Sequence, residues 1–407
     1  MFKINVPENN ENYALFERYL TKSFSFAITG LTTILRLFLI TKIKKITDKK
    51  ILFITSTEQS ALKYQNDLLK AFNEKTELIP FQNISMYESV SPNRYDYAEQ
   101  VRILTEKPDI VICPVKTLLE KFPTENFYKE NSITLKIGDE IDVKEISQKF
   151  IDLGYKRSTM VSDIGEFSIR GDIIDFYSLD KHPTRIELWG DEIVDIRYFN
   201  NETQKSIEKL SSANIMPMHK FTIKNGIPDE IKPEDEDGYF EGIEIYQNYF
   251  NQNLVSILDY FKDYIIVFDE ISEIYSKYEF TDKNYEEQLQ ENLKLGLNID
   301  LKGRNHIPFE DFIQKTAGFV KIGLNNFLDS ETDEIVEFNT QTVQNFGAKL
   351  DDIANYINSK QDYDIIIATD YPERVKEILS EKDIFDIEYN ESISSHGSVL
   401  EDFKTVI

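Results

Sequence analysis

Four short runs of almost purely apolar residues limit how this 407-residue chain can fold. They are KILFIT at 50–55, DIVIC at 109–113, YIIVFDE at 264–270 and DIIIAT at 364–369. Continuous runs of this length are typical of strands that are buried on both faces, as in a parallel sheet covered by helices. Helix-compatible segments follow the first and the last run, after Ser56 or Thr57 and at Pro372. The alternation predicts a doubly wound α/β fold.

Composition narrows the class of protein. Hydrophobic residues make up 41% of the chain, enough for sizeable packed cores. The net charge of −26 argues against a large electrostatic surface for DNA or anionic membrane. One cysteine and four histidines exclude a disulfide framework and make a zinc site unexpected. The start resembles no secretion signal, and the apolar stretch 26–40 contains Gly30 and Arg36, so we expect a soluble cytoplasmic protein without a membrane partner.

Changes in pattern divide the chain into domains. After Pro123 the residues alternate as in half-buried strands, and Gly190 and Asp191 between two such runs predict a β-hairpin. We predict an α/β domain made of two segments, with a small α+β domain inserted into it and a small α/β third domain after it. The predicted ranges are 1–127 and 219–317, 128–218, and 318–407.

The segment AITGLTTI at 27–34 has the position of a phosphate-binding P-loop, upstream of a strand that ends in Asp269 and Glu270. A working P-loop needs a Gly–Lys–Ser/Thr triplet to hold phosphates and Mg²⁺. The corresponding residues, counted from Gly30, are Thr32, Thr33 and Ile34. Because the lysine, the second glycine and the metal-binding hydroxyl are all replaced, we predict a degenerate nucleotide site without ATP hydrolysis.

A second candidate site surrounds Arg170 in GEFSIRGDIIDFY. If residues 166–176 form one strand, the side chains on one face are Ser168, Arg170, Asp172 and Ile174. Arginine beside exposed apolar surface is common in interface hot spots, and Lys156 and Arg157 could extend the positive patch. The alternative is an ordinary solvated face on which Arg170 pairs with Asp172. The residues alone leave both interpretations open.

A third candidate is a run of lysines at Lys42, Lys44, Lys45, Lys49 and Lys50. Such a run binds nucleic acid only if further basic and aromatic residues join it in space. The alternative is a solvated helix end that leads into the first apolar strand.

Two longer stretches carry a resemblance. GEFSIRGDIIDFY, followed by RIELWGDEIVDIRYFNNETQKS, is similar to the signature that the UvrB excision-repair subunit shares with the bacterial transcription-repair coupling factors (Mfd). SPNRYDYAEQVRIL, IGDEIDV, LGYKR, EGIEIYQNYF and YIIVFDE agree in the same order, and YDIIIATDYPERVKEIL resembles the third domain of the coupling factors. UvrB has an intact P-loop and a long tyrosine-rich hairpin. Here residues 82–100 are short and contain only Tyr87, Tyr95 and Tyr97, so the coupling factors are the better match.

The resemblance implies a UvrB-like degenerate P-loop domain with an inserted UvrA-binding domain. Coupling factors recognise RNA polymerase stalled at DNA damage, displace it with an ATP-driven translocase and recruit UvrA. Polymerase, DNA, ATP and Mg²⁺ belong to parts of the family's full-length protein that follow the residues seen here, so we expect a monomeric adaptor without cofactor or metal.

The resemblance also assigns residues. Arg170 matches an arginine that faces UvrA, Lys156 lies where the family has a basic contact, and Ile174 and Phe176 lie on the same strand. Ser168 stands where UvrB has an arginine. A different interpretation is a UvrB-type ATPase or helicase subunit, which predicts ATP turnover stimulated by DNA. A third is a DNA-binding module, which the charge opposes.

Overall fold

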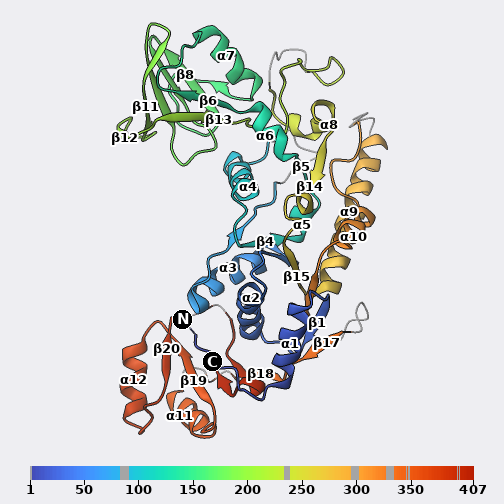
Figure 1. Ribbon diagram of the computed structural model, residues 1–407, viewed down its shortest axis with the longest axis vertical. Helices are drawn as coiled ribbons and strands as arrows, with labels where there is room; N and C mark the ends of the chain where they lie inside the picture. Colours follow the sequence, from blue (N-terminus) through green and yellow to red (C-terminus); the bar gives the residue numbers. More distant parts are fainter. Residues whose placement is uncertain are drawn as a thin grey trace.

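The computed structural model describes residues 2–82, 91–232, 239–294, 302–326, 334–344, 346, 349–391, 393 and 395–407. Tyr87 lies outside the described residues, so the difference between residues 82–100 and the long hairpin of UvrB stays a prediction. Figure 1 shows an elongated molecule with an α/β body at its centre, an antiparallel domain at one end and a smaller domain at the other.

The body is built on a parallel sheet. Within the described residues it has seven strands in the order β17-β1-β16-β15-β2-β4-β3, and every neighbouring pair is parallel. The strands are β1 (Phe26–Thr29), β2 (Ile51–Thr55), β3 (Glu77–Leu78), β4 (Ile110–Pro114), β15 (Ile265–Asp269), β16 (Lys321–Leu324) and β17 (Ile335–Glu337). The first three apolar runs are β2, β4 and β15, so the prediction of a parallel α/β sheet is confirmed.

Helices cover both faces of this sheet, which explains why its central strands are apolar throughout. Ile51 and Phe53 of β2 pack in one core with α1, α2 and α3, whereas Leu52 and Ile54 pack in another with α4, α5, α9 and α10. The helices are α1 (Glu11–Thr21), α2 (Thr33–Thr47), α3 (Glu58–Phe72), α4 (Arg94–Glu106), α5 (Val115–Leu118), α9 (Ile271–Lys294) and α10 (Phe309–Thr316). Smaller elements of the body are β5 (Lys121–Pro123), α6 (Glu125–Asn131), η1 (Ile243–Tyr246), α8 (Gln247–Phe250), β14 (Leu254–Ser256) and η2 (Ile257–Asp259).

The inserted domain has a core of its own. Its sheet has the order β12-β11-β10-β9-β8-β7, antiparallel except between β7 and β8, and a second, two-stranded sheet pairs β6 with β13. The elements are β6 (Ile133–Lys136), α7 (Val143–Asp152), β7 (Lys156–Arg157), β8 (Glu166–Arg170), β9 (Ile173–Phe176), β10 (Thr184–Trp189), β11 (Glu192–Phe199), β12 (Ser206–Lys209) and β13 (Ser212–Ile215). All of them lie inside the predicted range 128–218, and the predicted hairpin is the β10–β11 pair.

The third domain contains a mixed sheet in the order β18-β21-β22-β19-β20. Its elements are β18 (Thr340–Thr342), α11 (Leu350–Asn358), β19 (Asp364–Ala368), α12 (Pro372–Ser380), β20 (Glu388–Asn390), β21 (Ser398–Leu400), η3 (Glu401–Phe403) and β22 (Thr405–Val406). The boundary predicted at residue 318 lies too early for this sheet, because β16 and β17 pair with β1 in the body. Strand pairing places the change of sheet between β17 and β18.

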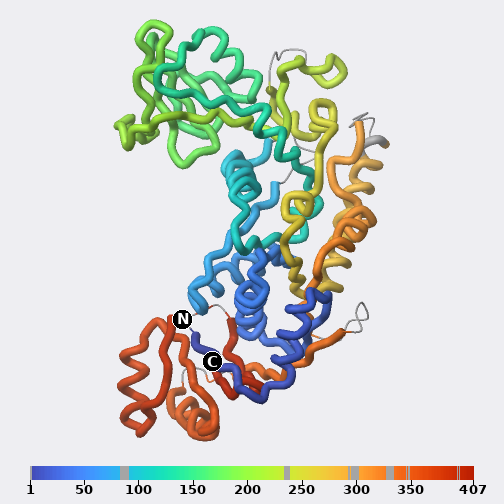
Figure 2. The backbone as a smooth tube through the Cα atoms, in the orientation of Figure 1, coloured from blue at the N-terminus to red at the C-terminus, as the bar shows by residue number. Residues whose placement is uncertain are grey.

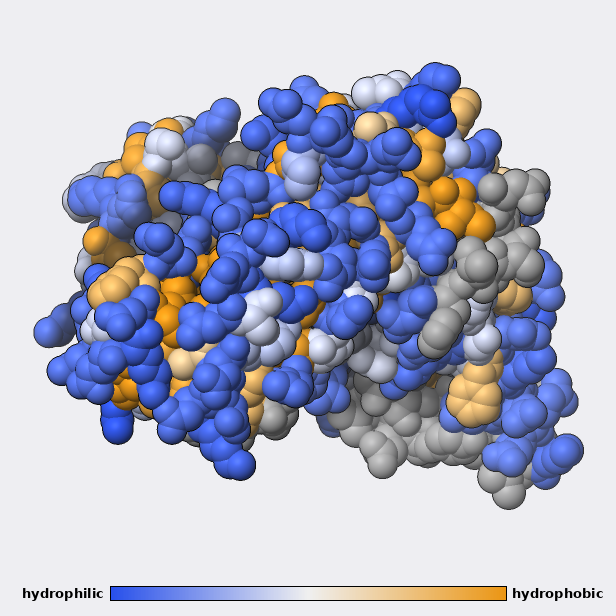
Figure 3. All heavy atoms as spheres, turned by 90° about the horizontal axis from the view of Figure 1, so that it is seen from below, coloured by the Kyte–Doolittle hydropathy of each residue, from blue (hydrophilic) through white to orange (hydrophobic). Residues whose placement is uncertain are grey.

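The third domain packs against the start of the chain. The ring of Phe403 lies 5.6 Å from that of Phe38 in α2 and 6.1 Å from that of Tyr13 in α1. Asn5 Nδ2 also donates to Asp364 Oδ2 at 2.9 Å, so the blue and red ends of the chain meet at the lower end of the molecule in Figure 2. Seen from below in Figure 3, hydrophilic side chains cover most of this end, with hydrophobic ones gathered in smaller patches between them.

Candidate functional site

The loop between β1 and α2 is closely covered by another part of the chain. Gly30 has a φ of 70°, and a Cβ atom at this position would lie 1.8 Å from the carbonyl oxygen of Phe338. Thr340 Oγ1 donates to the carbonyl of Gly30 at 2.6 Å. Gly30 is therefore needed both for its left-handed backbone and for the close approach of the segment that follows β17.

The end of β15 meets a cation supplied by the protein. Arg36 is buried in α2, and its guanidinium donates to the carboxylates of Asp269 and Glu270. It also donates to the Leu324 carbonyl at 3.0 Å and to Asn326 Oδ1 at 2.7 Å. Burial opposes the charge of Arg36, but the two carboxylates outweigh burial and raise its pKa. The acids that the sequence placed at a degenerate nucleotide site are thus held in internal ion pairs.

A cleft of about 310 Å³ opens beside this cluster. Its lining includes the predicted residues Thr32, Thr33, Asp269 and Glu270, together with Arg36 and with His396 and Ser398 from the third domain. Ile34 is fully buried in the core of the body, so its side chain is packed away from the cleft. Sequence reasoning did not assign Arg36 a role, although a single charge within the apolar run 34–40 was a visible signal.

The segment around Arg170 differs from the predicted single strand. Gly171 has a φ of 58°, and the chain turns there so that β8 and β9 form an antiparallel hairpin with Arg170 opposite Ile173. Register pairs Ser168 with Asp175, which places both on the face of Arg170. The prediction that Ile174 shares this face is wrong, because the turn shifts the alternation by one residue.

The burial of these side chains follows from the hairpin. Ile174 and Phe176 are each 0% exposed and pack in the core of the inserted domain, so neither presents surface to a partner. Ser168 is buried as well, and its hydroxyl donates to the Thr159 carbonyl at 3.2 Å. Lys156 and Arg157 are exposed on β7 at the edge of the sheet, next to β8.

Arg170 is positioned by a buried acid. Its side chain is 47% exposed, and Nη2 donates to Oδ2 of Asp175, which is 1% exposed, at 2.6 Å. Arg185 of β10 donates to both oxygens of the same carboxylate, at 2.6 and 2.9 Å, and stacks over the Phe199 ring. The ion pair considered for Asp172 is therefore made by Asp175. Arg185 was missed, although the alternation in RIELW marks it as an outward residue of its strand.

The charges continue across the sheet. Asp175 lies opposite Arg185, Arg185 opposite Arg197 and Arg197 opposite Lys209 in register. Arg197 pairs with Glu187 and Asp195, and Lys209 Nζ lies 2.8 Å from Asp195 Oδ1. We call the outward residues Arg170, Asp175, Arg185, Glu187, Asp195, Arg197 and Lys209 the arginine face.

One large apolar side chain stands at the end of the arginine face. Trp189 is the last residue of β10 and shares the outward alternation of Arg185 and Glu187. It is 82% exposed, and it is the single tryptophan of the chain. Tryptophan and arginine are the residue types most enriched at the centres of protein interfaces. The face therefore combines charge with an apolar anchor.

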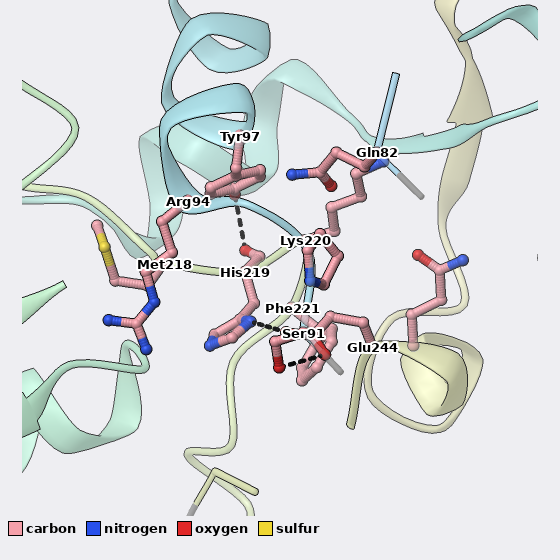
Figure 4. Close-up of a pocket in the computed structure, with 11 residues that line it drawn as sticks. Gln82, Ser91, Arg94, Tyr97, Met218, His219, Lys220, Phe221 and Glu244 are labelled. Atoms are coloured by element: carbon pink, nitrogen blue, oxygen red, sulfur yellow. Dashed lines mark hydrogen bonds and ion pairs between the residues drawn. The ribbon is translucent and has the colours of Figure 1, made fainter. Parts of the chain in front are cut away.

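The inserted domain rejoins the body through a tightly packed junction, drawn in Figure 4. His219 Nδ1 lies 3.0 Å from Glu244 Oε1, and the Ser91 hydroxyl donates to Glu244 Oε2 at 3.0 Å. The next residue, Lys220, pairs with buried Glu120 at 2.8 Å. Burial disfavours the charge of Glu244, but the bonds from His219 and Ser91 outweigh it and lower its pKa. These contacts hold the inserted domain and the body together at the junction.

A group of possible metal ligands lies between α9 and the segment that precedes α10. Asp282, Glu286 and His306 offer ligand atoms within 4.8 Å of one another. However, Asp282 already pairs with His306 Nε2 at 2.6 Å and accepts the Phe309 N–H at 2.9 Å, and Glu286 lies 3.1 Å from Arg304 Nε. Each of the three side chains is therefore engaged by another protein group.

Comparison with known proteins shows what the inserted domain is similar to. Residues 133–221 match the model of the UvrB interaction domain. All residues of the arginine face lie within this range. A transcription-repair-coupling factor of Staphylococcus aureus (strain bovine RF122 / ET3-1) is 26% identical over 92% of this chain. The resemblance to transcription-repair coupling factors is confirmed.

A coupling factor of Staphylococcus haemolyticus (strain JCSC1435) is 25% identical over 93% of the chain. In both comparisons the chain spans 36% of the length of the coupling factor. In the described part of the chain, none of the helices combines the length and the apolar character needed to cross a bilayer.

Proposed function

We propose that this chain is the part of a transcription-repair coupling factor that recruits UvrA, and that it does so without hydrolysing ATP. The observation that carries the proposal is the arginine face, because it lies within the stretch that matches the UvrB interaction domain. The similarity to coupling factors over 92% of the chain supports the assignment of the whole chain to that family's repair function.

Recruitment would work through charge and one apolar anchor. Asp175 and Phe199 hold the guanidinium groups of Arg170 and Arg185 in place before a partner arrives, so little side-chain entropy is lost on binding. Arg170 would pair with an acidic group of UvrA, and Trp189 would fill an apolar pocket beside it. Lys156 and Arg157 would add longer-range attraction from the edge of the sheet.

The absence of ATP hydrolysis is proposed from the contents of the cleft beside α2. Arg36 occupies the carboxylates of Asp269 and Glu270, which a nucleotide-bound Mg²⁺ would need. The residues at the loop supply no lysine for phosphate. We therefore propose a structural role for this region in place of the alternative, a UvrB-type ATPase.

The decisive experiment is co-elution of the purified chain with UvrA on a sizing column. Arg170→Glu and Trp189→Ala should each weaken the complex by about thirtyfold or more, as expected for a hot spot worth ~2 kcal/mol. Trp189→Ala should leave thermal unfolding unchanged, because the indole is 82% exposed. Arg170→Glu should lower the melting temperature, because it removes one of the two arginines that pair with buried Asp175, but the protein should stay folded at the assay temperature, since Arg185 still pairs with that carboxylate. Lys144→Glu in α7 and Phe280→Ala in α9 are matched exposed controls and should bind normally. Normal binding by both test variants would exclude the arginine face as the site.

A further inference from the structure

A large cleft lies in the body, away from the inserted domain. It has a volume of about 680 Å³ and is formed by the N-terminal segment, the second half of α2 and the end of α3. Its charged lining residues are Lys3, Lys42, Lys44, Lys45, Asp48 and Glu74, and we call it the lysine cleft. Three lysines of the basic run thus face one concavity, and Lys3 joins them from a distant part of the sequence. Lys50 is turned elsewhere, because its Nζ donates to the Lys107 carbonyl.

One of the four lysines is held in ion pairs. Lys44 is neutralised by Glu74 at 2.6 Å and by Asp109 at 3.1 Å. Across the residues that the structure describes, no ion pair joins Lys3, Lys42 or Lys45 to a carboxylate. The chain as a whole has a net charge of −26, so three lysines without an ion pair around one cleft form an unusual positive region on it. Such a region attracts anionic ligands.

The floor of the cleft is apolar. The ring of Phe72 lies 5.8 Å from that of Phe2 and 6.2 Å from that of Phe38. Lys42 Nζ lies 4.8 Å from the centroid of Phe38. Partial burial and repulsion from Lys45 lower the pKa of Lys42, although attraction from Glu17 opposes the shift. A concave wall of low dielectric constant strengthens the field of the charges around it, so an anion entering the cleft would meet a focused positive potential.

We propose that the lysine cleft binds a ligand that carries a chain of adjacent phosphate groups. Its cations are ammonium groups, which bind phosphate as compact point charges, and no arginine lines it to hold a carboxylate in bidentate fashion. The rings of Phe2, Phe38 and Phe72 are each at least 90% buried, so they offer no free surface on which nucleic-acid bases could stack. The site is independent of UvrA recruitment, because it lies in the body and the arginine face lies in the inserted domain.

The test is calorimetric titration of the whole chain with sodium tripolyphosphate. Saturable binding at one site is expected, and Lys42→Met and Lys45→Met should each weaken it about tenfold. Methionine keeps much of the apolar stem and removes the charge, so folding is preserved. Lys376→Met, at an exposed lysine of α12, removes the same charge elsewhere and should change affinity less than twofold. A parallel titration with ATP in the absence of Mg²⁺ distinguishes the two sources of phosphate. Tighter binding of ATP would indicate a phosphorylated small molecule, and tighter binding of tripolyphosphate would indicate free polyphosphate.

Four results would overturn the proposal. The first is the lack of saturable binding of either anion. The second is an equal loss of affinity in Lys376→Met, which would indicate non-specific attraction. The third is binding that survives both Lys42→Met and Lys45→Met, which would place the anion elsewhere. A single-stranded oligonucleotide that displaces tripolyphosphate and binds more tightly would also overturn it, because the cleft would then serve nucleic acid.

Discussion

Arg36 in α2 and Asp269 at the end of β15 form a buried ion pair at the centre of the body, although they are far apart in the sequence. Glu270, Asn326 and the Leu324 carbonyl also accept from the same guanidinium. A buried charge that loses its partner costs far more than the net value of the pair, because desolvation is no longer compensated. Because of this asymmetry, replacing Arg36 is a sensitive test of whether the cluster stabilises the fold.

Replacement of Arg36 by methionine should lower the free energy of unfolding by about 3–5 kcal/mol, because it leaves two carboxylates without their cation. Urea denaturation followed by circular dichroism measures this directly. Arg36→Lys keeps the positive charge but loses the planar set of donors. Its free energy of unfolding should therefore lie between those of the parent protein and Arg36→Met. A loss below about 1 kcal/mol for Arg36→Met would show that the carboxylates are solvated without it.

The junction of the inserted domain offers a double-mutant test. Lys220 and Glu120 are both buried and lie 2.8 Å apart, so Lys220→Met alone should destabilise the protein by about 3–5 kcal/mol. The double variant Lys220→Met/Glu120→Gln removes both charges and should recover part of that loss. Glu120→Gln alone completes the cycle, and a loss in the double variant equal to the sum of the two single losses would mean that the two charges do not interact.

Glu244 predicts a specific dependence on pH. Its pKa is lowered in the folded state, so the bonded carboxylate contributes stability above the unfolded pKa, near 4.5, and this contribution is lost as the pH falls through the folded value. At pH 7 Glu244→Gln should therefore be less stable than the parent by about 1–3 kcal/mol. The difference should shrink as the pH is lowered below about 4.5. Denaturation series at several pH values measure it, and a difference independent of pH would contradict the assignment.

Alanine variants at Gly30 and Gly226 separate the steric cost of an added methyl group from the conformational cost of a positive φ. Gly30→Ala should cost about 3 kcal/mol or more, because the new methyl group meets the Phe338 carbonyl and the residue keeps a positive φ. Gly226 has a φ of 80° but no atom within 4 Å of its would-be Cβ, so Gly226→Ala should show only the conformational part, about 1 kcal/mol. Similar losses for both variants would mean that the covering segment moves aside.

The parts of the fold that were predictable from sequence are those in which burial alone decides the structure. The strands β2, β4 and β15 are buried along their whole length between two layers of helices, and that environment leaves a continuous apolar run in the sequence. β16 and β17 are shorter and join the sheet through pairing with β1, so their sequences carry no comparable signal and the start of the third domain was placed too early.

The candidate sites also have features that the sequence could predict and features that it could not. Arg170 was found because its motif is distinctive, but its face was assigned wrongly beyond the turn at Gly171. The dipeptide Gly171 and Asp172 is the same turn signal as Gly190 and Asp191, and it was overlooked inside a run that alternates convincingly. The role of Arg36 depends on the end of β15 lying beside α2, which is a tertiary relationship that no local pattern contains.

The exposed indole at the tip of the β10–β11 hairpin also gives the molecule a built-in optical probe. Because Trp189 is the sole indole in the chain, fluorescence excited near the red edge of protein absorption comes from this one location. A protein that covers the hairpin would shift that emission towards shorter wavelengths and shield it from a soluble quencher. Docking on this end could thus be followed in real time, without attaching any dye, while events at the opposite end would leave the signal unaltered.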